Sequence, residues 1–203
     1  MNATLAKKMS PAVAAIWLFA LAPEPDAVAQ QAGTAPDDAD IAVHVVKNGA
    51  SIVVDVDLPV NATAIETWKV MTDYDNMARF VTNLESSAIL SRDRDRLVVA
   101  QKGKASRGPF TFAFENVREI VLTPYTEIRS RLISGNLEAS EFTTRVLDHG
   151  ASSQVVNHGE FIPKVWVPPI VGPAVIEAET RKQFQELRAE ILRRKAQTAA
   201  RNE

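Results

Sequence analysis

The feature that most constrains the fold is the alternation of apolar and polar residues between Leu84 and Phe161. This period-two pattern is typical of strands with one buried face, and it occurs in six runs: 84–91, 96–105, 110–121, 126–134, 137–147 and 152–162. Short segments that contain charged residues, Gly, Pro or Asn separate the runs. Because these segments are too short to hold a crossover helix, parallel pairing is excluded and the runs predict an antiparallel meander.

A seventh strand is predicted upstream of this meander. Residues 51–57 alternate cleanly, and Pro59 ends the run. The dipeptide Asn48-Gly49 before it is a strong turn signal, and residues 40–47 are compatible with a short strand of the same hairpin. We otherwise interpret residues 30–50 as a flexible lead-in, because their first part lacks apolar periodicity.

Two short helices are predicted between the seventh strand and the meander. Thr63 and Glu66 have the spacing of a capping box, which marks the start of the first helix. The apolar face of this helix is predicted from residues at every third position, namely Ile65, Trp68 and Met71. Residues 73–80 predict a second short helix with Met77 and Phe80 directed inward. The acidic residues at the junction, Asp73 and Asp75, are interpreted as helix caps.

A long helix is predicted from Pro173, which a first turn tolerates, to about Gln197. One continuous apolar stripe is formed by Ile176, Thr180, Phe184, Leu187 and Ile191, and the opposite face carries Glu179, Lys182, Glu186 and Arg193. The acidic Glu177 comes early and Arg193-Arg194-Lys195 come late, an order that complements the helix dipole. We expect the basic end to be solvated, with contact to an anionic membrane surface as the alternative.

The widths of the predicted elements do not match. One helix with its side chains is about 10–12 Å wide. Seven strands at a spacing of about 4.8 Å form a sheet more than twice as wide. The sheet must bury one face, so we expect it to curl around the helix and to close over a cavity or an added loop. The predicted fold class is therefore α+β, with a cavity as the main functional clue.

This order of elements resembles the helix-grip fold of the START-like (SRPBCC) superfamily, most closely its coenzyme-Q-binding and polyketide cyclase/dehydrase-like branch. The resemblance rests on the segments 60–62, 68–74, 80–84 and 166–169 and extends over residues 51–195. It implies a curved seven-stranded antiparallel sheet wrapped around a long C-terminal helix, with two short helices after the first strand. It also implies a ligand in the cavity between the sheet and that helix.

The candidate ligand-binding set combines aromatic residues with residues of the helix stripe. These are Phe112, Phe114, Phe142, Phe161, Trp166, Ile176, Thr180 and Phe184, with Phe110 on the same strand face as the first two. The alternative is a filled core that simply uses aromatic residues. A dry apolar pocket of about 300 Å³ would cost roughly 7 kcal/mol, so we expect a hydrated, collapsible or occupied cavity.

Polar residues give weaker signals. His158 and Glu160 share a strand face and could form an acid–base pair. Arg129 and Arg131 could bind an anionic headgroup, but solvated outer-face residues are the favoured interpretation. The three histidines lack the spacing of metal ligands, so we predict no metal and no cofactor. No Gly-x-Ser-x-Gly motif and no phosphate-binding glycine loop is present.

Composition excludes several function classes. The 203-residue chain has no cysteine, which excludes a disulfide framework, a thiol nucleophile and a thiolate zinc site. Its formal net charge of −2 argues against a general nucleic-acid binder. Residues 1–29 have a basic start, an apolar stretch and the triplet Ala27-Val28-Ala29, which predict a signal peptide cleaved after Ala29. An uncleaved anchor or a short buried helix is the alternative.

We therefore predict a periplasmic or secreted protein with a START-like domain at residues 51–197 and a tail at 198–203. Its expected function is to bind or carry a hydrophobic small molecule, such as a quinone, a lipid or a polyketide-like compound, as a monomer. The first alternative is a cyclase or dehydratase-type enzyme with an acid–base pair in the same cavity, which requires titratable groups that converge there. The second is an envelope assembly protein whose groove binds a partner peptide, which requires an exposed apolar patch.

Overall fold

The computed structural model describes residues 41–107, 110–164, 167 and 171–201, without the side chains of residues 105–107, 110, 112 and 171. The predicted signal segment and residues 30–40 of the lead-in lie outside the described residues. Export and signal cleavage therefore stay predictions from the sequence. The described helices include none with the length and apolar character that a membrane span requires.

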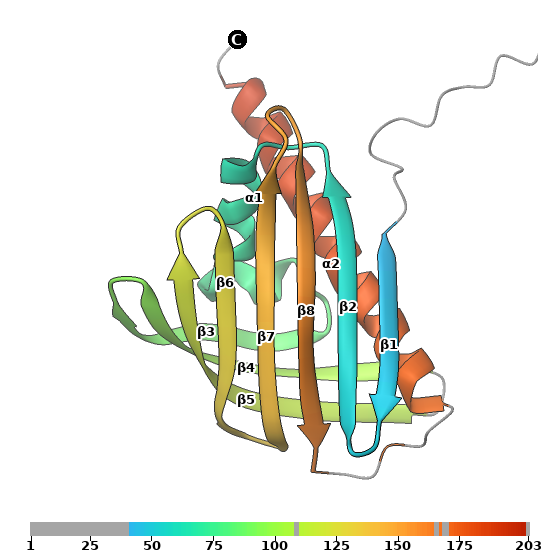
Figure 1. The fold of residues 1–203 in the computed structure, drawn as a ribbon. Coiled ribbons are helices and arrows are strands. Elements are labelled where there is room, and N and C mark those ends of the chain that lie inside the picture. Colours follow the sequence, from blue (N-terminus) through green and yellow to red (C-terminus); the bar gives the residue numbers. More distant parts are fainter. Residues whose placement is uncertain (1–40, 108–109, 165–166, 168–170, 202–203) are drawn as a thin grey trace, which may run out of the picture. The chain divides into compact units, whose positions relative to one another are not determined.

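The described strands form one antiparallel sheet (Figure 1). In chain order the elements are β1 (Ala42–Asn48), β2 (Ser51–Val60), α1 (Ala64–Met71), the 3₁₀ helix η2 (Tyr74–Arg79), β3 (Leu84–Asp93), β4 (Arg96–Arg107), β5 (Phe110–Thr123), β6 (Glu127–Gly135), β7 (Leu137–Asp148), β8 (Ser153–Pro163) and α2 (Val171–Ala199). The order across the sheet is β1-β2-β8-β7-β6-β5-β4-β3. The predicted meander is confirmed as β3 to β8.

The sheet has eight strands, so the prediction of seven is wrong by one. The additional strand is β1, which pairs with β2 along its whole length as the predicted hairpin. Gly49 has φ +60° in the connecting turn, a conformation that suits glycine. The sequence signal for β1 is weak because Val45-Val46 interrupts the alternation and because an edge strand buries little. Val43 is buried, whereas Val46 is exposed.

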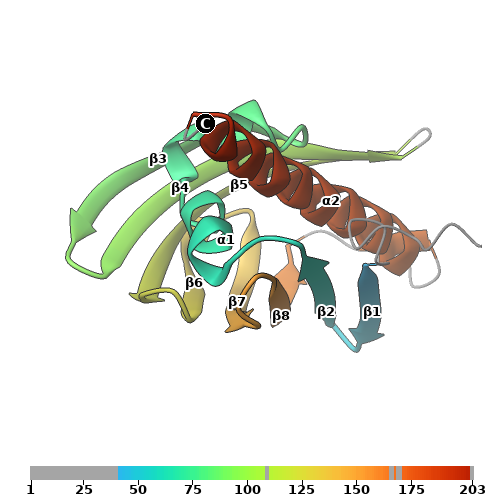
Figure 2. The ribbon, with the colours of Figure 1, turned by 90° about the horizontal axis from the view of Figure 1, so that it is seen from above.

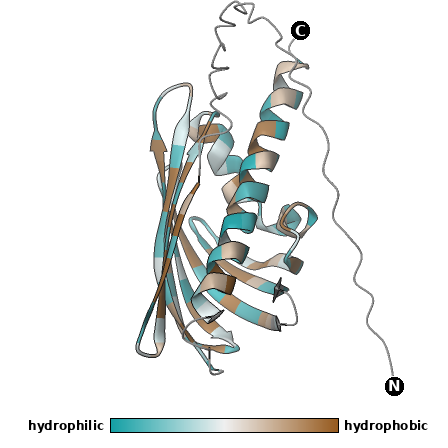
Figure 3. Cartoon of the chain, turned by 90° about the vertical axis from the view of Figure 1, so that its right-hand side faces the viewer, coloured by the Kyte–Doolittle hydropathy of each residue, from teal (hydrophilic) through white to brown (hydrophobic). Residues whose placement is uncertain are grey.

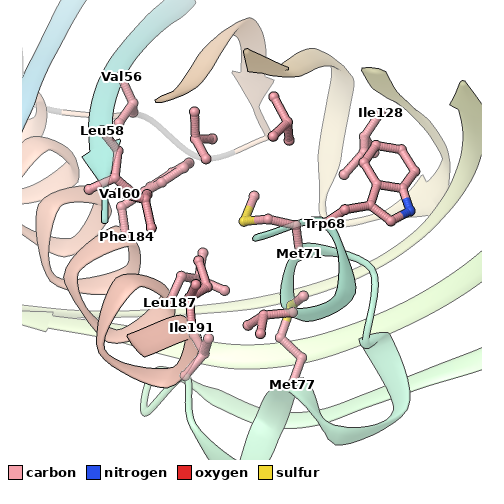
Figure 4. Packing of buried hydrophobic residues seen from close by; sticks show 14 of the residues in the cluster. Val56, Leu58, Val60, Trp68, Met71, Met77, Ile128, Phe184, Leu187 and Ile191 are labelled. Atoms are coloured by element: carbon pink, nitrogen blue, oxygen red, sulfur yellow. The ribbon is translucent and has the colours of Figure 1, made fainter. Parts of the chain in front are cut away.

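The sheet is curved, and α2 lies on its concave side (Figure 2). Hydrophobic and hydrophilic residues alternate along the strands (Figure 3). The concave face packs on α2 through Phe184, Leu187 and Ile191, which share one buried cluster with Val56, Leu58 and Val60 of β2 (Figure 4). The predicted α+β helix-grip architecture is confirmed, because one helix and one curved sheet provide this core.

Helix α1 begins with the predicted capping box. The Thr63 amide donates to Glu66 Oε2 at 2.8 Å, and the Glu66 amide donates to Thr63 Oγ1 at 3.3 Å. The predicted apolar face is wrong at Ile65, which is 52% exposed. The buried face instead includes Thr67, whose hydroxyl lies 2.8 Å from the Ser153 hydroxyl. A hydroxyl with a buried partner can lie in a core position that a strict apolar pattern excludes.

The second helix, η2, is present with Met77 buried and Phe80 partly buried, as predicted. The interpretation of Asp73 and Asp75 as helix caps is wrong, because neither side chain caps η2. Asp75 Oδ1 accepts from the Ile89 amide at 2.7 Å, and Asp73 Oδ2 accepts from Arg194 Nη2 at 2.8 Å. Both carboxylates therefore connect η2 to distant parts of the chain, β3 and α2.

The basic end of α2 is not simply solvated, which corrects the sequence interpretation. Arg193 and Arg194 both donate to Glu190, with N–O distances of 2.6 to 2.7 Å. Lys195 Nζ donates to the Asn61 carbonyl at 2.6 Å. These residues precede the last turn, which contains no basic side chain, so their role is attachment of α2 rather than compensation of its dipole. Hydrogen bonds from Arg193 and Arg194 lower the pKa of Glu190 to about 2, against the opposing effect of desolvation.

We expect Glu190→Gln to lower the free energy of unfolding by about 2 kcal/mol at neutral pH, because two guanidinium groups lose a charged acceptor. Since the pKa of Glu190 is depressed, its contribution is present above about pH 4.5 and is lost as the pH falls toward 2. Urea unfolding at neutral and acidic pH measures this difference. Glu119→Gln, which removes an exposed pair with Arg96, is the control and should change little. An equal loss at both pH values would contradict an ionic role for Glu190.

Candidate functional site

A cavity lies between the concave face of the sheet and α2, and it has two compartments. The outer compartment has a volume of about 370 Å³ and the inner one about 210 Å³. Six residues line both: Arg118, Phe142, Phe161, Ile176, Thr180 and Gln183. We call these six residues the waist, because the compartments meet there. The hollow expected from the widths of helix and sheet is therefore present.

The outer compartment lies beside the first turns of α2 and is mainly apolar. Apart from the waist, its apolar lining consists of Ala113, Phe114, Leu137, Pro163, Val167, Gly172 and Val175. Glu179 and Lys164 contribute charged groups, and Lys164 Nζ donates to the Gly135 carbonyl at 2.8 Å. The Oδ1 atoms of Asn83 and Asn116 are buried without a hydrogen-bond partner within the described chain. This compartment suits an apolar group that carries a few polar atoms.

The inner compartment, which lies beside the middle turns of α2, holds more polar side chains. Its polar lining comes from six elements and consists of Tyr74, Gln101, Arg118, Ser130, Thr144 and Asn157, beside Gln183 and Thr180 of α2. Several of these groups satisfy one another: Thr144 Oγ1 donates to Asn157 Oδ1 at 2.8 Å, and Gln101 Nε2 donates to Ser87 Oγ at 3.1 Å. Ser130 Oγ has no partner among the described residues. The inner compartment can thus hydrogen-bond the polar end of a ligand.

Arg118 is the most unusual group in the cavity. Its guanidinium donates from Nη2 to Gln101 Oε1, but Nε is buried and has no partner among the described residues. No described carboxylate forms an ion pair with it. Burial lowers the pKa of Arg118, although the nearby Tyr74 opposes this effect. A buried cation without a counter-ion is costly, and a ligand oxygen at Nε would offset part of that cost.

Tyr74 lies at the start of η2 and contributes its phenol to the inner compartment. Burial raises its pKa to about 12, and the charge of Arg118 partly opposes that shift. The phenol is therefore neutral near pH 7 and can donate or accept one hydrogen bond. Tyr74 and Arg118 are two titratable groups that converge in one compartment.

Most of the candidate ligand-binding residues from the sequence line this cavity. Phe114 lines the outer compartment, Phe184 lines the inner one, and Phe142, Phe161, Ile176 and Thr180 belong to the waist. The phenyl rings of Phe142 and Phe161 stack with centroids 6.4 Å apart. The side chain of Phe112, that of Phe110 and all of Trp166 lie outside the described residues, so their assignment stays a prediction.

Sequence reasoning missed Tyr74, Gln101 and Arg118. A signal for Arg118 was available: residues 114, 116, 118 and 120 share one face of β5, so the register that directs Phe114 inward also directs Arg118 inward. A charged residue on the apolar face of a strand is a functional signal. Asn157 and Phe161 lie on the same face of β8, because both line the inner compartment.

His158 and Glu160, which the sequence left open as an acid–base pair, do not form one. His158 Nδ1 lies 2.6 Å from Asp55 Oδ1, and Glu160 accepts from the Ser51 hydroxyl at 3.0 Å. Both residues are exposed, and neither lines the cavity. They belong to the convex face of the sheet because their positions alternate with the inward Asn157, Gly159 and Phe161.

Arg129 and Arg131 of β6 are exposed on the convex face, which agrees with their interpretation as solvated outer-face residues. Arg129 pairs with Glu127 at 2.7 Å, and Arg131 lies 3.4 Å from Glu141. Among the described residues, no group of three His, Asp or Glu side chains has an arrangement that could hold a metal ion. The candidate site is therefore the cavity, and its polar centre is Arg118 with Tyr74.

The sequence model of the family described as polyketide cyclase / dehydrase and lipid transport matches residues 60–188. This match runs from the end of β2 into α2 and includes every described residue of the waist. The chain belongs to this family. The START-like resemblance inferred from the sequence is thus confirmed at the level of family and fold. No curated protein sequence matches the chain significantly.

Solved structures of this fold are similar to the chain at low sequence identity. The Zhui aromatase/cyclase from Streptomyces sp. R1128 is 17% identical, with a TM-score of 0.60 over 71% of this chain and 95% of its own. A STAR-related lipid transfer protein from Xanthomonas axonopodis is 10% identical, with a TM-score of 0.57 over 73% and 98%. Norcoclaurine synthase from Thalictrum flavum is 16% identical, with a TM-score of 0.51 over 70% and 87%. These similarities show that the chain has the same fold as the three solved structures.

We expect the stability of this family member to fall between about pH 10 and pH 12 through Tyr74. The unfolded chain releases the phenol proton near its ordinary pKa of 10, whereas the native state holds it to about 12, so alkaline pH favours unfolding. Two pKa units correspond to roughly 3 kcal/mol. Chemical denaturation of wild type and Tyr74→Phe over this range measures the effect, which the variant should lack. Tyr125→Phe, at an exposed turn, is the matched control, and a Tyr74→Phe protein with the wild-type pH slope would refute the assignment.

Proposed function

We propose that this protein binds and carries a hydrophobic small molecule with an acidic or carbonyl oxygen, held in the cavity beneath α2 and anchored at Arg118. The observation that carries the proposal is the buried Nε of Arg118, which has no partner among the described residues and lines both compartments. The family match and the mainly apolar outer compartment support a hydrophobic ligand.

The size of the cavity supports an occupant. A dry apolar void of about 370 Å³ would cost roughly 9 kcal/mol, which rivals the whole stability of a domain. Water can relieve this cost near the polar atoms but gains little beside Phe114, Val175 and the phenyl rings of the waist. An apolar ligand that displaces such water gains about 25 cal/mol for each Å² of apolar surface that it buries.

Arg118 favours ligands whose polar end accepts hydrogen bonds. A guanidinium only donates, and it binds carboxylates and other oxyanions with good geometry. A fatty acid, an enolised polyketide-like compound and the carbonyl oxygens of a quinone all present such acceptors. We propose that the polar end lies at Arg118 and that the apolar remainder occupies the outer compartment.

Catalysis in the same cavity, as in a cyclase or dehydratase, is the second candidate function. Tyr74 and Arg118 favour it, since Arg118 could stabilise an enolate oxygen while the Tyr74 phenol donates a hydrogen bond. Burial, however, raises the pKa of Tyr74 to about 12, far from the neutral value that suits general acid–base catalysis. This mismatch makes binding the better-supported function. A partner peptide is less well supported, because the site lies beneath a helix rather than on an exposed apolar face.

The test combines recovery of the natural ligand with a defined probe. Native mass spectrometry after mild extraction should detect a co-purified apolar molecule. For the delipidated protein, laurate should displace the fluorescent sulfonate 1-anilinonaphthalene-8-sulfonate, and Arg118→Met should weaken laurate binding by about 1.5–3 kcal/mol, roughly tenfold or more. Because the variant removes an unpaired buried cation, its free energy of unfolding should be unchanged or higher.

Arg129→Met removes an exposed arginine of the convex face and is the matched control, with unchanged laurate affinity. Ligand-free protein from every preparation, together with no displacement by laurate, a long-chain alcohol or ubiquinone, would refute the binding function. Unchanged laurate affinity in Arg118→Met would refute the anchor alone. Turnover of a polyketide-like substrate that Tyr74→Phe abolishes would favour the enzyme.

We further propose export with cleavage after Ala29, which rests on the order of Lys7-Lys8, the apolar stretch 11–22 and the small residues Ala27 and Ala29. Expression of the full chain in a bacterium with a periplasm should yield a periplasmic protein whose mass corresponds to a start at Gln30. Ala29→Leu, which removes a small residue at the cleavage position, should accumulate the uncleaved chain. A cytoplasmic protein with an intact N-terminus would contradict export.

A further inference from the structure

The waist divides the cavity at a defined depth along several elements. On β8, Asn157 lines the inner compartment, Phe161 lines both and Pro163 lines the outer one. On β7 the same order is Thr144, Phe142 and Ser140. A ligand that enters beside the first turns of α2 must therefore pass Phe142 and Phe161 to reach the inner compartment.

The phenyl ring of Phe142 lies flat against the sheet because its cross-strand partner has no side chain. Phe142 pairs directly with Gly159 of β8. A Cβ atom at position 159 would overlap the Cδ1 and Cγ atoms of the Phe142 ring. The ring therefore occupies the space above Gly159, where it lines both compartments.

A second glycine–phenylalanine pair provides a natural comparison. Phe114 pairs directly with Gly103, and a Cβ atom at position 103 would overlap the end of the Phe114 ring. Phe114 lines only the outer compartment, whereas Phe142 lines both. The two rings have the same kind of local support but different depths, so only Phe142 can control passage between the compartments.

We propose that Phe142, held flat over Gly159, is the specificity-determining residue that sets how deep a ligand reaches. A slim ligand such as a fatty acid carries its polar end past the waist, where that end contacts Arg118 from the inner compartment. A broad fused-ring ligand stays in the outer compartment and reaches only the outer side of Arg118. This inference rests on the proposed binding function and adds the size of ligand that each compartment accepts.

Two methionine side chains can report whether a ligand occupies the inner compartment. Its four methionines are Met1, Met9, Met71 and Met77. Met71 and Met77 both line the inner compartment, and neither lines the outer one. Figure 4 shows both side chains among the buried residues. The methyl resonances of these two residues, assigned with Met71→Leu and Met77→Leu, therefore report a ligand that has passed the waist.

The experiment uses the full chain with ¹³C-methyl methionine and two probes, laurate and 9-anthracenecarboxylate, with displacement of the fluorescent sulfonate to measure binding. In wild type, both probes should bind, and only laurate should shift the Met71 and Met77 signals. In Phe142→Trp, whose larger ring extends into the waist, laurate should still displace the sulfonate while the two signals keep their ligand-free positions. In Phe142→Ala, 9-anthracenecarboxylate should gain the ability to shift both signals.

Phe114→Trp is the matched control: it narrows the outer compartment, so affinity falls, but any bound laurate should still shift Met71 and Met77. If laurate shifts both signals in Phe142→Trp as in wild type, or if Phe142→Ala does not admit 9-anthracenecarboxylate, Phe142 does not set the depth. If Phe142→Trp fails to fold, the result with Phe142→Ala alone decides whether Phe142 sets the depth. If no probe displaces the sulfonate from wild type, the binding function fails instead, which separates the two proposals.

Discussion

The structure depends on a mismatch of width between one helix and the sheet that it covers. Eight strands at a spacing of about 4.8 Å far exceed the diameter of a single helix. Curvature brings the concave face toward α2, but Phe184, Leu187 and Ile191 fill the space only beside the central and C-terminal turns of the helix. The space that stays open between the sheet and α2, from the first turns of the helix to Leu187, is the cavity. The mismatch thus leaves the core between α2 and the sheet incomplete, and the open space is a site for a small molecule.

Polar interactions distribute stability unevenly along α2. Its C-terminal half is attached through Asp73, Glu190, Arg194 and Lys195, in addition to buried apolar side chains. Its first turns face the outer compartment, with Val175 and Ile176 beside empty volume. At the centre, Arg118 is partly buried and its buried Nε has no partner among the described residues, a cost that the packing of the rest of the domain offsets. Stability and the site are therefore concentrated at opposite ends of one helix.

The sequence was sufficient for the fold because period-two alternation and turn residues are local signals. The meander, the capping box at Thr63 and the long C-terminal helix were all predicted on that basis. The errors have physical causes as well: β1 is an edge strand with a weak pattern, and Thr67 is buried through a hydroxyl pair with Ser153. The attachment of Asp73 to Arg194 joins residues 121 positions apart, which no local pattern can reveal. Arg118 differs, because the register of β5 that directs Phe114 inward also directs this charged residue inward, against the usual rule that charged side chains face solvent.

The central claim is that the space beneath α2 is an open site centred on Arg118. A crystal structure of the protein, purified without detergent or delipidation, tests this claim most directly. We expect elongated electron density in the outer compartment that ends in an oxygen within hydrogen-bond distance of Arg118 Nε. A structure in which Phe142, Phe161 and Ile176 close the space completely, with the Arg118 guanidinium paired to a carboxylate of the chain, would contradict it.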